Sequence, residues 1–169
     1  MGLAGPHAGR RAPPRPAALG GPHLPRGVLR PVSALRLTRT YHFSAGHRLA
    51  SPALSDAENA RVYGPCYRQH GHNYRVEVTL AGRLDPETGM AADLALLDAA
   101  VKRVILEPVD HHDLSGTVPA LDGVITTGEN LARAFWQWLE PALPPGSLTR
   151  VAVIETDNNA FEYRGETAR

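Results

Sequence analysis

The sequence contains a single cysteine, Cys66, among its 169 residues. One thiol excludes an intramolecular disulfide framework and fits a reducing compartment, so we expect a cytoplasmic protein. No run of apolar residues approaches the ~18 that a membrane-spanning helix needs, which argues against a membrane partner. The formal net charge is only +1, so the total charge gives no support for nucleic-acid binding.

Acidic residues are missing from residues 1–33, which hold five arginines and seven of the fifteen prolines. A Pro- and Gly-rich stretch without hydrophobic periodicity cannot recover its ordering entropy through burial, so we predict that this segment is disordered. We interpret it as an inert extension or a mistaken start of translation, with a targeting sequence or a functional arm as alternatives. A single folded domain is expected over residues 34–169.

Alternation of apolar and polar residues predicts four strands in the remaining chain. The expected ranges are 35–43, 72–82, 148–156 and 160–163. Strands and helices follow one another in the order β-β-α-α-β-β, without the alternation of a parallel sheet. The fold class is therefore α+β, with a four-stranded antiparallel sheet and two helices on one face.

Two amphipathic stripes predict the helices, over residues 93–106 and about 128–140. Asp93 is expected to cap the first helix, and Pro108 marks its end. Thr126 and Glu129 form a capping-box pattern for the second helix. Residues 50–66 show no periodicity and are expected to form a loop.

Three histidines are spaced as metal ligands. His70 and His72 begin the second strand, where alternate residues point the same way with Cα atoms about 6.6 Å apart. Gly71 between them allows backbone or substrate to approach closely. His47 follows the first strand and becomes a third ligand if the two strands are antiparallel neighbours. Three imidazoles without a thiolate favour a catalytic Zn²⁺ site; ordinary surface histidines are the alternative.

The same histidines also fit a different metal-binding class. Gly64, His70, His72 and Glu77 match the first motif of a cupin, which would imply a jelly roll and often iron. A cupin needs a later histidine, however, and none follows His112. Two long amphipathic helices also do not belong in a cupin core, so the cupin is the weaker alternative.

Two further groups could move protons. Cys66 lies four residues before His70, and a nearby Zn²⁺ would favour its thiolate, which can abstract a proton; a buried small hydrophobe is the alternative. Asp110 precedes His111, and a carboxylate can hold an imidazole in the tautomer suited to proton transfer. A solvated loop is the alternative for this pair, and no role can be assigned to His112.

These motifs, in this order, resemble the 6-pyruvoyl-tetrahydropterin synthase / 6-carboxytetrahydropterin synthase family over residues 36–163. The matching segments are Phe43-Ser-Ala-Gly-His47, Cys66-x-x-x-His70-Gly-His72, Gly89-Met-Ala-Ala-Asp93, Asp110-His-His-Asp-Leu114, Thr127-Gly-Glu-Asn130, and Glu155-Thr156 followed by Tyr163. The three-residue gap between Cys66 and His70 resembles the bacterial, carboxy-forming branch.

The resemblance implies roles for eight side chains. They are zinc ligation by His47, His70 and His72, proton abstraction by Cys66, a proton relay by Asp110 and His111 from a neighbouring subunit, pterin anchoring by Glu155, and a further pterin contact by Thr127. A carboxylate such as Glu155 can accept two parallel hydrogen bonds from a pterin ring. No role follows for His42.

The resemblance also implies an assembly and a reaction. In the tunnelling fold, sheets of three subunits close into a barrel and two rings stack into a hexamer, a dimer of trimers, which covers the sheet edges. The implied substrate is 7,8-dihydroneopterin triphosphate. It would give 6-carboxy-5,6,7,8-tetrahydropterin, acetaldehyde and triphosphate, in the pathway to queuosine-type deazapurines. The alternatives are the 6-pyruvoyl-forming enzyme and a non-catalytic zinc- or pterin-binding protein. Candidate triphosphate contacts are Arg48, Arg61, Arg68 and Lys102.

Overall fold

Four antiparallel strands form one sheet in the computed structural model, which describes residues 35–166. The prediction of disorder over residues 1–33 lies outside the described residues. The strands are β1 (Leu35–His47), β2 (His70–Gly82), β3 (Leu148–Thr156) and β4 (Asn159–Tyr163), hydrogen-bonded in that order. All four predicted strands are confirmed. The first two extend further than predicted, so that His47 and His70 are themselves paired across β1 and β2.

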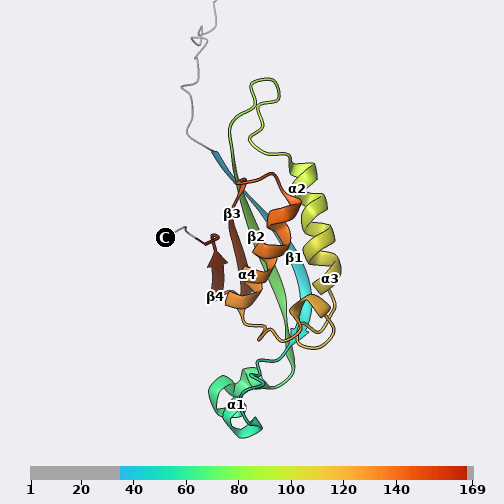
Figure 1. Cartoon of the computed structure of the whole chain (residues 1–169), viewed down its shortest axis with the longest axis vertical. Coiled ribbons are helices and arrows are strands. Elements are labelled where there is room, and N and C mark those ends of the chain that lie inside the picture. The colour runs from blue at the N-terminus through green and yellow to red at the C-terminus, as the bar shows by residue number, and fades with distance from the viewer. Residues whose placement is uncertain (1–34, 167–169) are drawn as a thin grey trace, which may run out of the picture. The chain divides into compact units, whose positions relative to one another are not determined.

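The helices cover one face of this sheet (Figure 1). They are α2 (Leu94–Val101), continued by η2 (Lys102–Leu106) and α3 (Glu107–Val109), and α4 (Gly128–Leu139). Short 3₁₀ turns lie before α4, at η3 (Pro119–Leu121), and directly after it, at η4 (Glu140–Ala142). The predicted α+β arrangement is therefore confirmed for the described residues.

The loop predicted over residues 50–66 is wrong for much of its length. It contains α1 (Asp56–Tyr63) and the 3₁₀ turn η1 (Gly64–Tyr67), which lie where β1 ends and β2 begins (Figure 1). A capping box starts α1, because the Ser55 hydroxyl accepts from the Glu58 amide and the Glu58 carboxylate accepts from the Ser55 amide. The helix carries little apolar surface, which is why periodicity did not reveal it.

The predicted boundaries of the first long helix are also partly wrong. Asp93 caps α2 by accepting from the Leu96 amide at 3.0 Å, as predicted. The helix does not stop before Pro108, however, because residues 102–106 widen into a π-helical turn. Pro108 lies within this continuous helical segment directly after the π turn; it has no N–H to donate to a preceding carbonyl, and the helix ends at Val109.

The second long helix begins one residue later than the capping-box pattern suggested. Thr127, not Thr126, is the N-cap, and its hydroxyl accepts from the Asn130 amide at 3.4 Å. Thr126 is buried, and its hydroxyl lies 3.4 Å from Nδ1 of His47. The start is set by packing, because Gly128 lies directly against the ring of Phe161 on β4.

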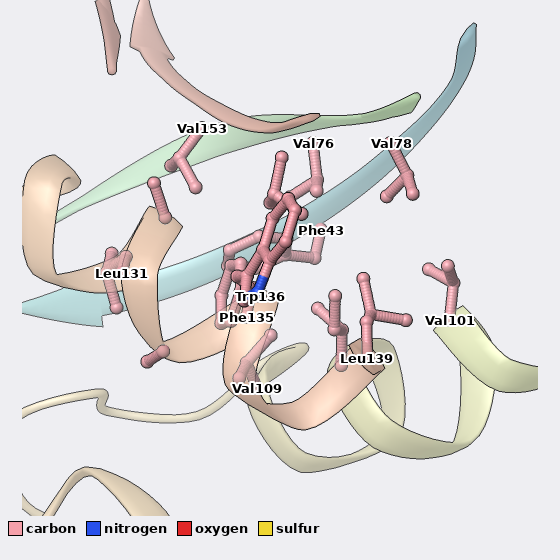
Figure 2. Packing of buried hydrophobic residues seen from close by; sticks show 14 of the residues in the cluster. Phe43, Val76, Val78, Val101, Val109, Leu131, Phe135, Trp136, Leu139 and Val153 are labelled. Atoms are coloured by element: carbon pink, nitrogen blue, oxygen red, sulfur yellow. The ribbon is translucent and has the colours of Figure 1, made fainter. Parts of the chain in front are cut away.

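A single hydrophobic core lies between the sheet and these helices. Figure 2 shows Val76 and Val78 of β2 and Phe43 of β1 facing Phe135 and Leu139 of α4. The opposite face of the sheet is polar, with hydrogen bonds such as that between the hydroxyls of Thr38 and Thr79. No helix within residues 35–166 is long and apolar enough to cross a bilayer.

Gly128→Ala is expected to destabilise the protein. A Cβ at this position would overlap the Phe161 ring, so either α4 or β4 must shift. Overpacking of this kind costs about 1–3 kcal/mol, which chemical denaturation will measure. Comparison of Gln137→Ala with Gln137→Gly, at an exposed interior position of the same helix, is the control for propensity alone. A free energy of unfolding unchanged in Gly128→Ala would contradict the close packing.

Candidate metal centre

The three histidines lie at one end of the sheet, on the face that carries the core. Tyr74 and Val76 point toward the helices, and the alternation of β2 gives His70 and His72 the same direction. The pairing of His47 with His70 brings the end of β1 to the start of β2. A Cβ at Gly71 would lie 3.1 Å from the Ala45 carbonyl oxygen, so the glycine allows the two strands to approach closely here.

The histidine side chains converge. One ligand nitrogen from each of His47, His70 and His72 lies within 4.8 Å of the other two. The ring centroids of His47 and His70 are 4.5 Å apart, and those of His70 and His72 are 5.0 Å apart. His47 is buried and the other two are partly exposed. The spacing predicted from sequence thus produces a cluster that could hold one metal ion.

Two of the rings form hydrogen bonds to backbone carbonyls through Nδ1. Nδ1 of His47 lies 3.0 Å from the Thr126 carbonyl oxygen, and Nδ1 of His70 lies 2.7 Å from the Arg68 carbonyl oxygen. A carbonyl oxygen only accepts, so each Nδ1 carries the proton. Each Nε2 therefore presents a lone pair, which is the form in which imidazole binds a metal.

Glu155 of β3 completes the same surface. Its Oε1 lies 3.3 Å from Nε2 of His47 and 3.4 Å from Nε2 of His72. Contact with His47 holds the pKa of the Glu155 carboxyl below its usual value, against the opposing effect of burial. Burial lowers the pKa of His72, which favours its neutral, metal-binding form. Glu155 has the same parity on β3 as the buried Val151 and Val153, so it points to the same side of the sheet.

The chemistry of these side chains fits a metal ion. The buried Nε2 of His47 has no hydrogen-bond partner: Oε1 of Glu155 lies 3.3 Å away, but a carboxylate oxygen and an unprotonated Nε2 are both acceptors. A buried, unsatisfied nitrogen costs stability unless something binds it. Three neutral imidazoles leave at least one position of a tetrahedral ion open, as catalytic sites require.

Cys66 lies beside the cluster but is not a member of it. It sits in η1 and is half-buried. Its carbonyl oxygen accepts from the Leu49 amide at 2.8 Å, which fixes η1 against the chain two residues beyond His47. The thiol is not among the groups that converge with the three histidines within the described residues.

Asp110 and His111 form a pair on the outer edge of β1. Nδ1 of His111 lies 2.9 Å from Oδ1 of Asp110, which also accepts from the Ser44 amide at 2.9 Å. The Ser44 amide holds the pKa of Asp110 below its usual value. His111 has a backbone φ of 61°, and its side chain is 79% exposed. The structure does not bring this pair into the histidine cluster of its own chain.

Two residues near the site were not assigned a site role from the sequence. Thr126 accepts from His47 through its carbonyl, and its hydroxyl lies 3.2 Å from that of Ser115. The spacing of residues in the sequence cannot reveal that the Thr126 carbonyl contacts His47, because every residue has a backbone carbonyl. Thr127, expected to contact a pterin, is the N-cap of α4 and is half-buried beside them.

The family profile described as 6-pyruvoyl tetrahydropterin synthase matches residues 36–166. The chain belongs to the 6-pyruvoyl tetrahydropterin synthase family. Human 6-pyruvoyl tetrahydrobiopterin synthase is 45% identical over 133 residues, 78% of this chain and 92% of that protein. The Dictyostelium discoideum enzyme of the same name is 42% identical over 130 residues, 77% and 96% of the two chains.

Solved structures of the 6-pyruvoyl tetrahydropterin synthase family share the fold. The Caenorhabditis elegans 6-pyruvoyl tetrahydropterin synthase gives a TM-score of 0.76 at 38% identity, covering 80% of this chain and 99% of that one. The Plasmodium falciparum protein gives 0.59 at 15% identity with 80% and 100% coverage, a likeness of fold alone. The subunit fold predicted from the resemblance, an antiparallel four-stranded sheet with helices on one face, is confirmed, and the cupin alternative is wrong.

The expected carboxy-forming activity is wrong. The curated relatives are 6-pyruvoyl tetrahydrobiopterin synthases that are 39% to 46% identical to this chain, not 6-carboxytetrahydropterin synthases of queuosine synthesis. The expectation depended on the short gap between Cys66 and His70. That gap spans the connection from η1 to β2, whereas the register of β2 fixes His70 and His72. Its length can vary without moving the ligands, so it is a poor marker of branch.

Proposed function

We propose that the chain is a 6-pyruvoyl-tetrahydropterin synthase. It acts on 7,8-dihydroneopterin triphosphate, releases triphosphate and forms the 6-pyruvoyl product. The observation that carries this proposal is the 45% identity to the human enzyme over 92% of its length. The converging histidines, with the unpartnered Nε2 of His47, support a metal-dependent reaction.

The resident ion is proposed to be Zn²⁺, held by His47, His70 and His72. When bound, it supplies Lewis acidity to the hydroxyls of the substrate side chain. Glu155 accepts hydrogen bonds from the pterin ring. Its Oε1 lies 3.3 to 3.4 Å from Nε2 of His47 and His72, so a pterin held there has its side chain beside the histidines. Cys66 accepts a proton from a substrate carbon. Thr127 is proposed as a further pterin contact.

Asp110 and His111 are proposed to serve the site of a neighbouring subunit. Asp110 holds Nδ1 of His111, so that Nε2 points outward from a largely exposed ring. We propose a hexamer, a dimer of trimers, in which this ring reaches a second copy. Within the described residues β1 and β4 are the two edge strands of the sheet. Pairing these edges with other copies of the chain would satisfy their unpaired backbone N–H and C=O groups. Light scattering on the full chain will measure the mass of the assembly.

Arg48 is the proposed contact for the triphosphate. It follows His47 directly and lines a cavity of about 320 Å³ together with Tyr67 and Ser115. Its guanidinium lies over the Tyr67 ring, 5.6 Å from the centroid. Asp56 also lines this cavity, and its carboxylate accepts a hydrogen bond from the Tyr67 hydroxyl.

The test is a turnover assay with 7,8-dihydroneopterin triphosphate on metal-loaded full-length protein. Release of triphosphate with the 6-pyruvoyl product supports the proposal. Release of acetaldehyde, or binding of substrate without turnover, would overturn it. Protein stripped by a chelator and then reloaded with Zn²⁺ is the control for metal dependence.

Glu155→Gln is expected to weaken pterin binding while the metal is retained. The amide keeps the shape but loses the charge that strengthens two hydrogen bonds, each worth about 1.5–3 kcal/mol when one partner is charged. Affinity for a non-reactive pterin should fall about 10- to 100-fold, as measured by fluorescence titration. Glu87→Gln, in an exposed turn, is the control. Equal pterin affinity in both variants would remove Glu155 from this role.

A further inference from the structure

His47 is the buried member of the cluster, and its ring is held by a chain of hydrogen bonds on the side away from the metal face. Only 1% of its surface is exposed. Nδ1 lies 3.0 Å from the Thr126 carbonyl oxygen and 3.4 Å from the Thr126 hydroxyl. The ring direction therefore depends on where the segment around Thr126 is placed.

The Thr126 hydroxyl continues the chain to Ser115. These two hydroxyl oxygens are 3.2 Å apart. The Ser115 oxygen in turn accepts from the Arg48 amide at 2.9 Å and lies 3.0 Å from the Arg48 carbonyl oxygen. Arg48 is the residue after His47, so the chain of bonds closes on the backbone of the ligand itself.

The protons of this loop can be assigned in only one consistent way. A carbonyl oxygen accepts, so the His47 Nδ1–H donates to Thr126 and the Ser115 hydroxyl donates to the Arg48 carbonyl. The Thr126 hydroxyl must then donate to Ser115, whose own proton is already in use. Every donor is used once, and the His47 Nε2 is left with its lone pair toward the cluster.

The segment that carries Ser115 is itself fixed to β1. The Gly46 amide donates to the His112 carbonyl at 2.9 Å, and the Leu114 amide donates to the Gly46 carbonyl at 2.8 Å. The segment thus runs parallel to the end of β1 as a short extra bridge. Ser115 joins this rigid edge to the irregular segment before α4, which otherwise contacts the ligand through one carbonyl.

We propose that Thr126 and Ser115 are positioning residues for His47: the Thr126 carbonyl fixes the tautomer with the proton on Nδ1, and the two hydroxyls hold that carbonyl, and with it the ring direction, in place for metal binding. Groups that orient a ligand in this way contribute about 10- to 100-fold to metal affinity. The proposal needs only that the cluster binds an ion. It rests on the metal site of the proposed function and does not depend on which product is formed.

The experiment measures Zn²⁺ affinity of full-length Thr126→Val, Ser115→Ala and the double variant by competition with a chelator. Valine keeps the shape of threonine, and Ser115 is exposed, so both variants should fold. Each is expected to weaken binding about 10-fold or more. The double variant should lose no more than the weaker-binding single variant, because both remove the same bond. Thr126→Ser restores the hydroxyl and should restore affinity.

A second readout separates positioning from stability. The His47 Nδ1–H resonance should exchange with water faster in both variants, and the electronic spectrum of the Co²⁺-loaded protein should change. Ser147→Ala is the control, since its hydroxyl donates to the Pro144 carbonyl in an exposed turn. Affinity within about twofold of the wild type in Ser115→Ala, with an unchanged Co²⁺ spectrum, would overturn the proposal even if Thr126→Val failed to fold.

Turnover distinguishes this proposal from the proposed function. If the wild-type protein binds Zn²⁺ but forms no product, the function fails and the affinity comparison still decides the positioning roles. If turnover is normal and affinity does not depend on either hydroxyl, only the positioning proposal fails.

Discussion

His47→Ala is expected to abolish stoichiometric metal binding and turnover together. The variant removes the buried ligand and the unpartnered nitrogen that faces the cluster. Loss of an outer-shell partner alone costs about 10- to 100-fold in affinity, and loss of a ligand must cost more. Elemental analysis of purified protein and the turnover assay will measure both effects.

Stability gives an independent measure of the same site. A metal at a free concentration of 100 times its Kd stabilises the folded state by about 2.7 kcal/mol, so a chelator should lower the Tm of the wild type. The Tm of His47→Ala should not respond to the chelator. His72→Ala, at a more open position, should behave in the same way if the loss of the buried ring obscures the result.

His42→Ala is the matched control for these variants. His42 is exposed on β1, one residue out of phase with the inward-facing row that contains His47. Its substitution should leave the metal content and the response to the chelator unchanged. Full metal occupancy in His47→Ala would contradict the three-histidine site.

Cys66→Ala is expected to retain the metal and lose turnover. The thiol lies in η1 outside the cluster, so its removal should leave the three imidazoles in place. A positioned proton acceptor contributes about 10²- to 10⁴-fold, which is the expected fall in kcat. The assay is the same turnover measurement, with metal content determined in parallel. A fully active variant would exclude Cys66 from proton transfer.

The single cysteine provides a chemical check on this variant. Because the sequence has no other thiol, alkylation of the wild type with iodoacetamide modifies Cys66 alone. One equivalent of label should inactivate the enzyme without releasing the metal. The alanine variant should show no further loss of its residual activity on the same treatment.

The sequence was sufficient to predict the sheet and the convergence of the histidines, because both depend on a period of two. The same alternation that predicted the strand over 72–82 gave His70 and His72 a common direction, and the pairing with His47 followed from antiparallel neighbours. These features come from local geometry that a single sequence contains.

The features that sequence reasoning missed depend on tertiary contacts or on weak local signals. The capping box at Ser55 and Glu58 was available, but α1 lacks an apolar stripe that would have supported it. The start of α4 near Gly128 was predicted, but its N-cap was assigned to Thr126 because Glu129 completes a capping-box pattern there, whereas Thr127 is the N-cap. The partner of His47 is a carbonyl, and every residue has one. The carboxy-forming branch was inferred from one gap, whereas identity over the whole domain favours the 6-pyruvoyl-forming branch.

The row of side chains that ends in His70 and His72 begins in the hydrophobic core, with Tyr74, Val76 and Val78 on the same side of β2. Slipping this strand by one residue would turn the whole row to the polar side, so core and ligands would be lost in one event. A substitution that leaves the register of β2 unchanged therefore also leaves the direction of these two imidazoles unchanged. The packing of the core and the geometry of the histidine cluster depend on the same register.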